Sequence, residues 1–155
     1  MFNEISILQN LITKNLVNVS SELPYKLNHI MIGDVPGIWS DYVPCCTIIP
    51  LPSQVIGQYI GEDTDRENIL VRFYVSAGSG ELSEPDTASG MMKLISMCEM
   101  MKYLVRKDPT FGSQMVTCII NSIQYYTAQS GNTNVARCAE ISLSCLARRL
   151  WNPTL

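Results

Sequence analysis

The sequence has few charged residues for its length. Only 16% of its 155 residues are Asp, Glu, Lys or Arg, whereas a soluble domain commonly carries about 25%. The formal net charge is −3, so the chain offers no basic field that would attract nucleic acid through its phosphates. Subunit interfaces are depleted in Lys, Glu and Asp, and the shortage of charge therefore favours a surface partly covered by other subunits. A surface rich in Ser, Thr, Asn and Gln is the alternative explanation.

A basic leader, a long apolar run and a paired cysteine motif are missing too. The first residues, MFNEISILQNLITKNL, lack the basic start and cleavage site of a signal peptide, and no run approaches the ~20 apolar residues of a membrane span. We therefore expect a soluble, cytosolic protein without membrane contact. The six cysteines include no CxxC pair that would begin a zinc site. In the cytosol such thiols are expected to be buried and reduced.

Histidine is present once, which limits the catalytic chemistry. A nucleophilic cysteine or serine needs a base, and His29 is the only candidate of that kind. Together with the adjacent Cys45 and Cys46, His29 is the candidate for an enzymatic or small-molecule site. No GxSxG elbow, phosphate loop or dinucleotide fingerprint accompanies them. We expect no catalysis, metal or cofactor, and an enzymatic or ligand-binding domain remains the alternative from another class.

Apolar periodicity predicts two helices. Apolar residues recur at intervals of three and four over residues 2–19, which indicates a first amphipathic helix. A second set with the same period predicts a helix that begins at Asp86 or Thr87 and ends at Lys107, just before Pro109. Between the helices, residues 76–90 are expected to form a loop of about fifteen residues.

Alternation of apolar residues predicts the strands. Short strands are expected at residues 30–32 and 43–50, and a strongly alternating strand at 69–75. Residues 115–128 and 137–149 predict a long hairpin around the turn QSGNT. On its first strand we expect Ile119, Ile123 and Tyr125 on one face and Cys118, Ile120 and Tyr126 on the other.

The order of these elements predicts a single α+β domain over residues 1–155. Strands joined by short connections favour a mostly antiparallel β-sheet, with the two main α-helices packed on one face and the long C-terminal β-hairpin closing the chain. Strands of about thirteen residues span roughly 44 Å. Strands of this length commonly extend past the helices that cover a sheet. We therefore expect the hairpin to project beyond the helices as an arm.

The stretch DPTFGS has the residues of a turn that ends the second helix. Asp108 can accept hydrogen bonds from backbone amides a few residues ahead, and Thr110 belongs to the same turn. Pro109 fixes φ, and Gly112 permits a positive φ. Nothing in this pattern requires a substrate.

The stretch GEDTDREN, residues 61–68, concentrates charge. It does not match a calcium-binding loop, because Gly and a carboxylate are missing where that loop needs them. We interpret it as a solvated charged turn that pairs with complementary charges on a neighbouring subunit. The candidate interface with subunits or partners comprises Glu62, Asp63, Asp65, Arg66, Glu67, Arg72, Tyr126, Arg137, Arg148 and Arg149.

The order of elements resembles one known family. The strand from Pro44 to Ile48, the alternating strand from Ile69 to Val75, the turn D-x-T-[LF]-G starting at Asp108, and the closing hairpin are similar to those of the tail terminator, or tail completion, proteins of long-tailed bacteriophages. The resemblance covers nearly the whole chain. Where the family usually has a pair of glycines, this chain has Gly112 followed by Ser113.

The resemblance implies a structural protein of the virion without catalysis. Members of the family form a hexameric ring that caps the tail tube, stops its polymerisation and provides the docking surface for the head connector. Genome DNA passes through the ring without sequence-specific binding. Another neck or tail-tube subunit, such as a head-closure protein, is the alternative within the same class.

Overall fold

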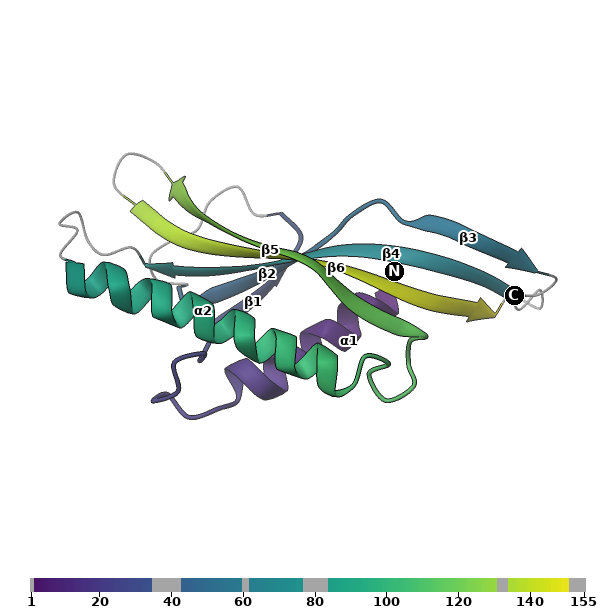
Figure 1. Ribbon diagram of the computed structural model, residues 1–155, viewed down its shortest axis with the longest axis horizontal. Helices are drawn as coiled ribbons and strands as arrows, with labels where there is room; N and C mark the ends of the chain where they lie inside the picture. Colours follow the sequence, from purple (N-terminus) through teal and green to yellow (C-terminus); the bar gives the residue numbers. More distant parts are fainter. Residues whose placement is uncertain (1, 35–42, 60–61, 77–83, 131–133, 151–155) are drawn as a thin grey trace.

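The computed structural model describes residues 2–34, 43–59, 62–76, 84–130 and 134–150. Within them the fold is α+β, as the sequence predicts: a six-stranded, mostly antiparallel sheet, two α-helices and a C-terminal hairpin (Figure 1). The elements in chain order are α1 (Phe2–Ile12), the π-helical turn η1 (Thr13–Val17), β1 (His29–Ile32), β2 (Cys45–Pro50), β3 (Gln54–Tyr59), β4 (Glu62–Ser76), α2 (Glu84–Lys107), β5 (Thr117–Ser130) and β6 (Asn134–Leu150).

Two long strands form the centre of the sheet. The strand order is β1-β2-β4-β6-β5, and β3 pairs separately with the first half of β4. Among the strands that the structure describes, only β1 and β2 pair in parallel. β4 has 15 residues and β6 has 17, and they pair from Glu62 opposite Leu150 to Ser76 opposite Ala136. At about 3.4 Å per residue each strand is roughly 50 Å long or more.

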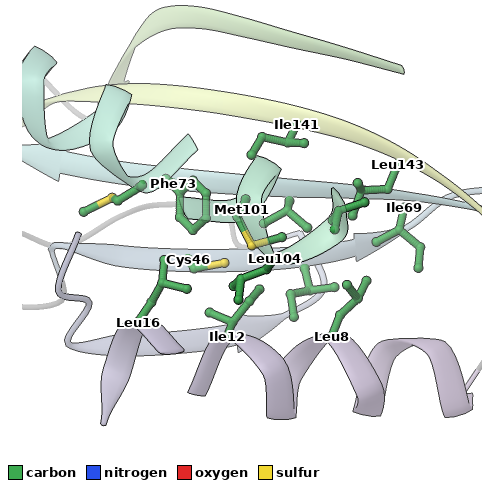
Figure 2. Close-up of a cluster of buried hydrophobic side chains, with 14 of the residues drawn as sticks. Leu8, Ile12, Leu16, Cys46, Ile69, Phe73, Met101, Leu104, Ile141 and Leu143 are labelled. Atoms are coloured by element: carbon green, nitrogen blue, oxygen red, sulfur yellow. The ribbon is translucent and has the colours of Figure 1, made fainter. Parts of the chain in front are cut away.

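Both helices pack on the same face of the sheet and bury one continuous core (Figure 1). Residues spaced by four point from α1 and η1 toward the sheet, and α2 contributes a matching apolar face. The sheet side is formed by alternate residues of β2, β4 and β6, as strand geometry requires. Figure 2 shows the centre of this core, with Leu8, Ile12, Leu16, Cys46, Ile69, Phe73, Met101, Leu104, Ile141 and Leu143.

The helix boundaries differ slightly from the sequence prediction. The first helix is regular to Ile12 and continues to Val17 as a π-helical turn, and Leu16 stays fully buried within that turn. The second helix begins at Glu84 and ends at Lys107, so it starts two or three residues earlier than the predicted start at Asp86 or Thr87. The remainder of the predicted loop, residues 77–83, lies outside the described residues.

The charged stretch is the largest error of the sequence prediction. Its residues from Glu62 to Asn68 are not a solvated turn: they form the first half of β4, paired with β6 throughout and with β3 from Glu62 to Arg66. Gly61 lies outside the described residues. We did not predict β3 at all. Hydrogen bonds to the neighbouring strands fix the extended conformation of this segment. The segment lacks the apolar alternation from which a strand is predicted.

A β-bulge corrects the predicted faces of β5. The pairing of β5 with β6 shifts by one residue between Ile120 and Ser122. Such an insertion reverses the alternation of side chains beyond it. Ile119 is therefore 53% exposed, whereas Ile123 packs against the core on the opposite face. The prediction that these two isoleucines share a face was wrong. The tip of the hairpin, residues 131–133, lies outside the described residues.

Candidate functional site

One carboxylate organises the turn after α2. Asp108 accepts hydrogen bonds from the backbone N–H of Thr110 at 3.2 Å, the hydroxyl of Thr110 at 2.8 Å and the backbone N–H of Gly112 at 2.6 Å. The Thr110 hydroxyl oxygen in turn accepts from the N–H of Ser113 at 3.2 Å. These hydrogen bonds lower the pKa of the Asp108 carboxyl, and those from the Thr110 hydroxyl and the Gly112 N–H have the largest effect. The predicted role of Asp108 is confirmed.

The same turn contains three consecutive residues with positive φ. Phe111 has φ 48°, Gly112 69° and Ser113 66°. The predicted left-handed conformation at Gly112 is confirmed, and Ser113 adopts it as well. Pro109 follows Asp108 in the tight turn that the N–H of Phe111 closes on the Asp108 carbonyl. The turn thereby directs Phe111 into the core and starts β5 along the sheet.

At one end of the molecule, β3 and the paired ends of β4 and β6 extend past both helices (Figure 1). We call this part the arm: it comprises β3, residues 62–68 of β4 and residues 144–150 of β6. The projecting element is therefore not the β5–β6 hairpin that we predicted: β5 begins at Thr117, opposite Leu146 of β6, and the third strand of the arm is β3, which pairs with the other edge of β4. On β3, the edge strand of the arm, Val55 is 56% exposed and Ile56 is 47% exposed.

Strand alternation divides the charged residues of the arm between two faces. Asp65 and Glu67 point toward the core side, where they are only 9% and 2% exposed. Placing these two carboxylates in a solvated docking patch was therefore wrong. Arg66 lies between them and is exposed.

Near the tip, Glu62 forms an ion pair with the exposed Arg148, with an N–O distance of 3.3 Å. Asp63 is half-buried, and its register partner is Arg149, whose side chain lies outside the described part of the structure. The charges that remain accessible on the described arm are thus those of Arg66 and Arg148, together with the partly exposed Glu62 and Asp63.

On the helix-free face of the sheet, Arg72 is already engaged within the chain. Its Nε donates to Glu140 at 2.7 Å across the β4–β6 pair, and its Nη1 lies 3.5 Å from Asp34. Arg137 is half-buried, and Tyr126 is 39% exposed. Burial, followed by contact with the Cys138 thiol, raises the pKa of the Tyr126 phenol. Of these three residues, Tyr126 is the only one that is exposed.

The residues of the enzymatic alternative do not form a reactive centre. Cys45 lies opposite His29 on the neighbouring strand, but Cys45 and Cys46 are both fully buried. Burial raises the pKa of Cys45 to about 12 and that of Cys46 well above its usual value. Thiols that stay protonated at neutral pH are poor nucleophiles. His29 itself is exposed at the edge of the sheet.

Two shallow grooves flank the end of α2. One, of about 420 Å³, lies between α1 and the turn at Asp108. The other, of about 500 Å³, lies between the end of α2 and β5, where Lys102 and Arg106 line it together with Cys118 and Ile119. Among the side chains that the structure describes, no three His, Cys, Asp or Glu residues are grouped to hold a metal ion. No helix of the described segments is long and apolar enough to cross a bilayer.

Sequence reasoning missed β3 and the burial of Asp65 and Glu67. One signal was available: Asp65 and Glu67 occupy the same alternate positions of the strand as Ile69 and Val71, whose side chains face the core.

Comparison with known proteins does not identify a family: no protein-family model matches the chain, and no curated protein matches its sequence.

Proposed function

We propose that this chain is a tail terminator protein of a long-tailed bacteriophage, acting as a subunit of a ring, hexameric as in the family, that caps the tail tube. In this role it ends tube polymerisation and offers the docking surface for the head connector. Its partners are further copies of itself, the tail-tube protein and the connector. The role places the protein in the neck of the virion and involves no catalysis and no cofactor.

The observation that carries this proposal is the arm. β3 is an edge strand whose two apolar side chains, Val55 and Ile56, are about half exposed. An edge strand of this kind pairs readily with another chain unless something covers it. The arm also extends past the helices, so a neighbouring subunit can reach it without displacing the core (Figure 1).

The two long sides of the sheet differ, which favours a ring. The arm ends in β3 on one side, and β5 forms the edge on the other. Contact between two different surfaces is heterologous, and repeating it produces a closed ring when the rotation per subunit allows closure. Addition of one edge strand to another supplies main-chain hydrogen bonds for such a contact. We therefore propose that the β3 edge of one copy meets the β5 edge of the next.

The charge of the chain suits a ring through which DNA passes. With a net charge of −3, the subunit supplies no surplus of cations to retain the phosphates of the genome. The low content of charged residues also suits a subunit that is covered on two sides.

Assembly in the presence of tail tubes tests the proposal. The tail-tube protein of the same genome is polymerised with and without this chain, tube lengths are measured by electron microscopy, and the mass of the free chain is measured by mass photometry. A terminator is expected to form closed rings at tube ends and to stop growth. A chain that stays monomeric and leaves tube lengths unchanged would refute the proposal. Polymerisation of the chain itself into tubes would identify a tail-tube subunit instead.

A charge placed on the arm tests the contact. Val55→Lys combined with Ile56→Lys is expected to prevent ring formation while the fold persists, because the introduced charges would have to be buried between subunits. Met92→Lys is the matched control, since Met92 is 60% exposed on α2, away from the arm. Equal assembly of the two variants would rule out β3 as the interface.

A further inference from the structure

Two cysteine thiols meet across the β5–β6 hairpin. Cys118 and Cys145 are direct register partners on antiparallel strands, and their Sγ atoms are 2.9 Å apart. Both side chains are buried against the core that the helices cover. Cross-strand partners have Cβ atoms about 4.5–5.5 Å apart, and a disulfide needs about 3.5–4.5 Å. A small approach of the two strands is therefore enough to join these sulfurs.

The bulge in β5 creates this pair. Near the hairpin tip, Ser130 pairs with Asn134, and a regular ladder continued from there would place Cys118 opposite Leu146. The one-residue shift between Ile120 and Ser122 places it opposite Cys145 instead. It also brings both thiols to the same face of the sheet.

Both thiols are buried, with Cys118 1% exposed and Cys145 fully buried, but they differ in their position relative to the groove beside α2. Cys118 lines the groove between α2 and β5, so a small molecule in the groove approaches this sulfur first. Cys145 lies behind it on β6, where the Cys118 thiol and burial raise the pKa of Cys145. Lys102 and Arg106 also line the groove.

We propose that Cys118 and Cys145 form a redox modification site, at which a peroxide entering the groove converts the two thiols into a disulfide that joins β5 to β6. The Cys118 sulfur first attacks hydrogen peroxide: an S–O bond forms, the O–O bond breaks, and one water leaves. The Cys145 sulfur then attacks the sulfenic acid: the S–S bond forms, the S–O bond breaks, and the thiol proton leaves with the hydroxide as the second water. Two thiols lose two electrons in total, and the peroxide is reduced to two waters.

The disulfide would fix the hairpin at its base. It links residues 27 positions apart in the sequence, and such a bond stabilises mainly by restricting the unfolded chain. It also ties the edge strand β5 to the strand that continues into the arm. This consequence holds for a single copy of the chain and does not depend on the proposed function.

Peptide mapping tests the site directly. The reduced full-length protein is treated with hydrogen peroxide until added glutathione in the same tube is fully oxidised. It is then denatured, alkylated without reductant and digested. We expect one linked peptide pair containing Cys118 and Cys145, two hydrogens lighter than the sum of its parts, and alkylation of the other four cysteines. The melting temperature should rise by roughly 5–10 °C and return on reduction.

Variants separate this site from general thiol oxidation. Cys118→Ser and Cys145→Ser should each abolish the linked peptide and the reversible rise in melting temperature. Cys98→Ser is the matched control, because Cys98 is also buried but lies on α2, and it should retain both. Alkylation of all six cysteines, overoxidation of Cys118 without a link, or a link to another cysteine or chain would overturn the proposal. The mapping of the unmodified protein decides this even if a serine variant fails to fold.

Discussion

Two neighbouring substitutions in the turn after α2 should change stability in opposite directions. Gly112 and Ser113 both have a left-handed backbone, with φ 69° and 66°. Only the first is a glycine, for which this conformation carries no steric cost. Gly112→Ala should therefore destabilise the protein, and Ser113→Gly should stabilise it.

The magnitude follows from the backbone alone. A Cβ added at Gly112 would meet no heavy atom within 4 Å, so the substitution causes no clash beyond the residue's own conformation. A left-handed L-residue costs about 1–2 kcal/mol. Loss of glycine restricts the unfolded chain and returns about 0.4–1 kcal/mol. We expect Gly112→Ala to lower the free energy of unfolding by about 1 kcal/mol, and Ser113→Gly to raise it by a similar or smaller amount.

Urea unfolding followed by circular dichroism is the appropriate assay, since a shift in midpoint at constant slope reports stability. For a domain of this size, 1 kcal/mol corresponds to about 2–4 °C in melting temperature. Ser113→Ala is the control and should change little, because alanine has the same difficulty with positive φ as serine. The backbone N–H of Ser113, which donates to Thr110, is kept in all variants at this position.

Two results would refute this reasoning. If Gly112→Ala were as stable as the unmodified protein, the positive φ at Gly112 would not constrain the choice of residue. If Ser113→Gly lowered stability, the serine would contribute something other than backbone strain.

Three further predictions concern the turn, the core and the arm. Because the pKa of Asp108 is lowered in the folded protein, the ionised carboxylate contributes its full stability above the ordinary pKa of 3.8, and this contribution is lost as the pH falls through the folded pKa. The urea midpoints of the unmodified protein and Asp108→Asn should therefore converge at acidic pH. A difference that stays constant with pH would contradict this. Phe73→Ala removes a fully buried ring and should cost about 3–5 kcal/mol in the same assay, whereas a loss below about 1 kcal/mol would show a core that collapses around the gap. Glu67→Lys should cost about 3 kcal/mol or more, because the site is buried, while Arg66→Glu on the exposed face should cost less than about 1 kcal/mol; similar midpoints would place Glu67 in solvent.

Much of the fold is local and can be predicted from the sequence. The apolar residues of α1 and α2 recur with the period of a helix, and those from Ile69 to Val75 alternate as a strand does. Asp108 and Gly112 predict the turn after the second helix, because each residue type favours the backbone geometry of such a turn. The α+β class follows from the order of these segments.

The arm and the thiol pair needed the tertiary structure. The first half of β4 carries charges rather than an apolar alternation, and hydrogen bonds from β3 and β6 make it a strand. One inserted residue in β5 decides whether Cys118 faces Leu146 or Cys145. Strand pairing depends on residues far apart in the chain, and a shift of one residue moves every side chain beyond it to the other face. The sequence thus determined the two helices, the apolar strands and the turn at Asp108, and the tertiary structure determined β3, the register, the projecting arm and the place where two sulfurs meet.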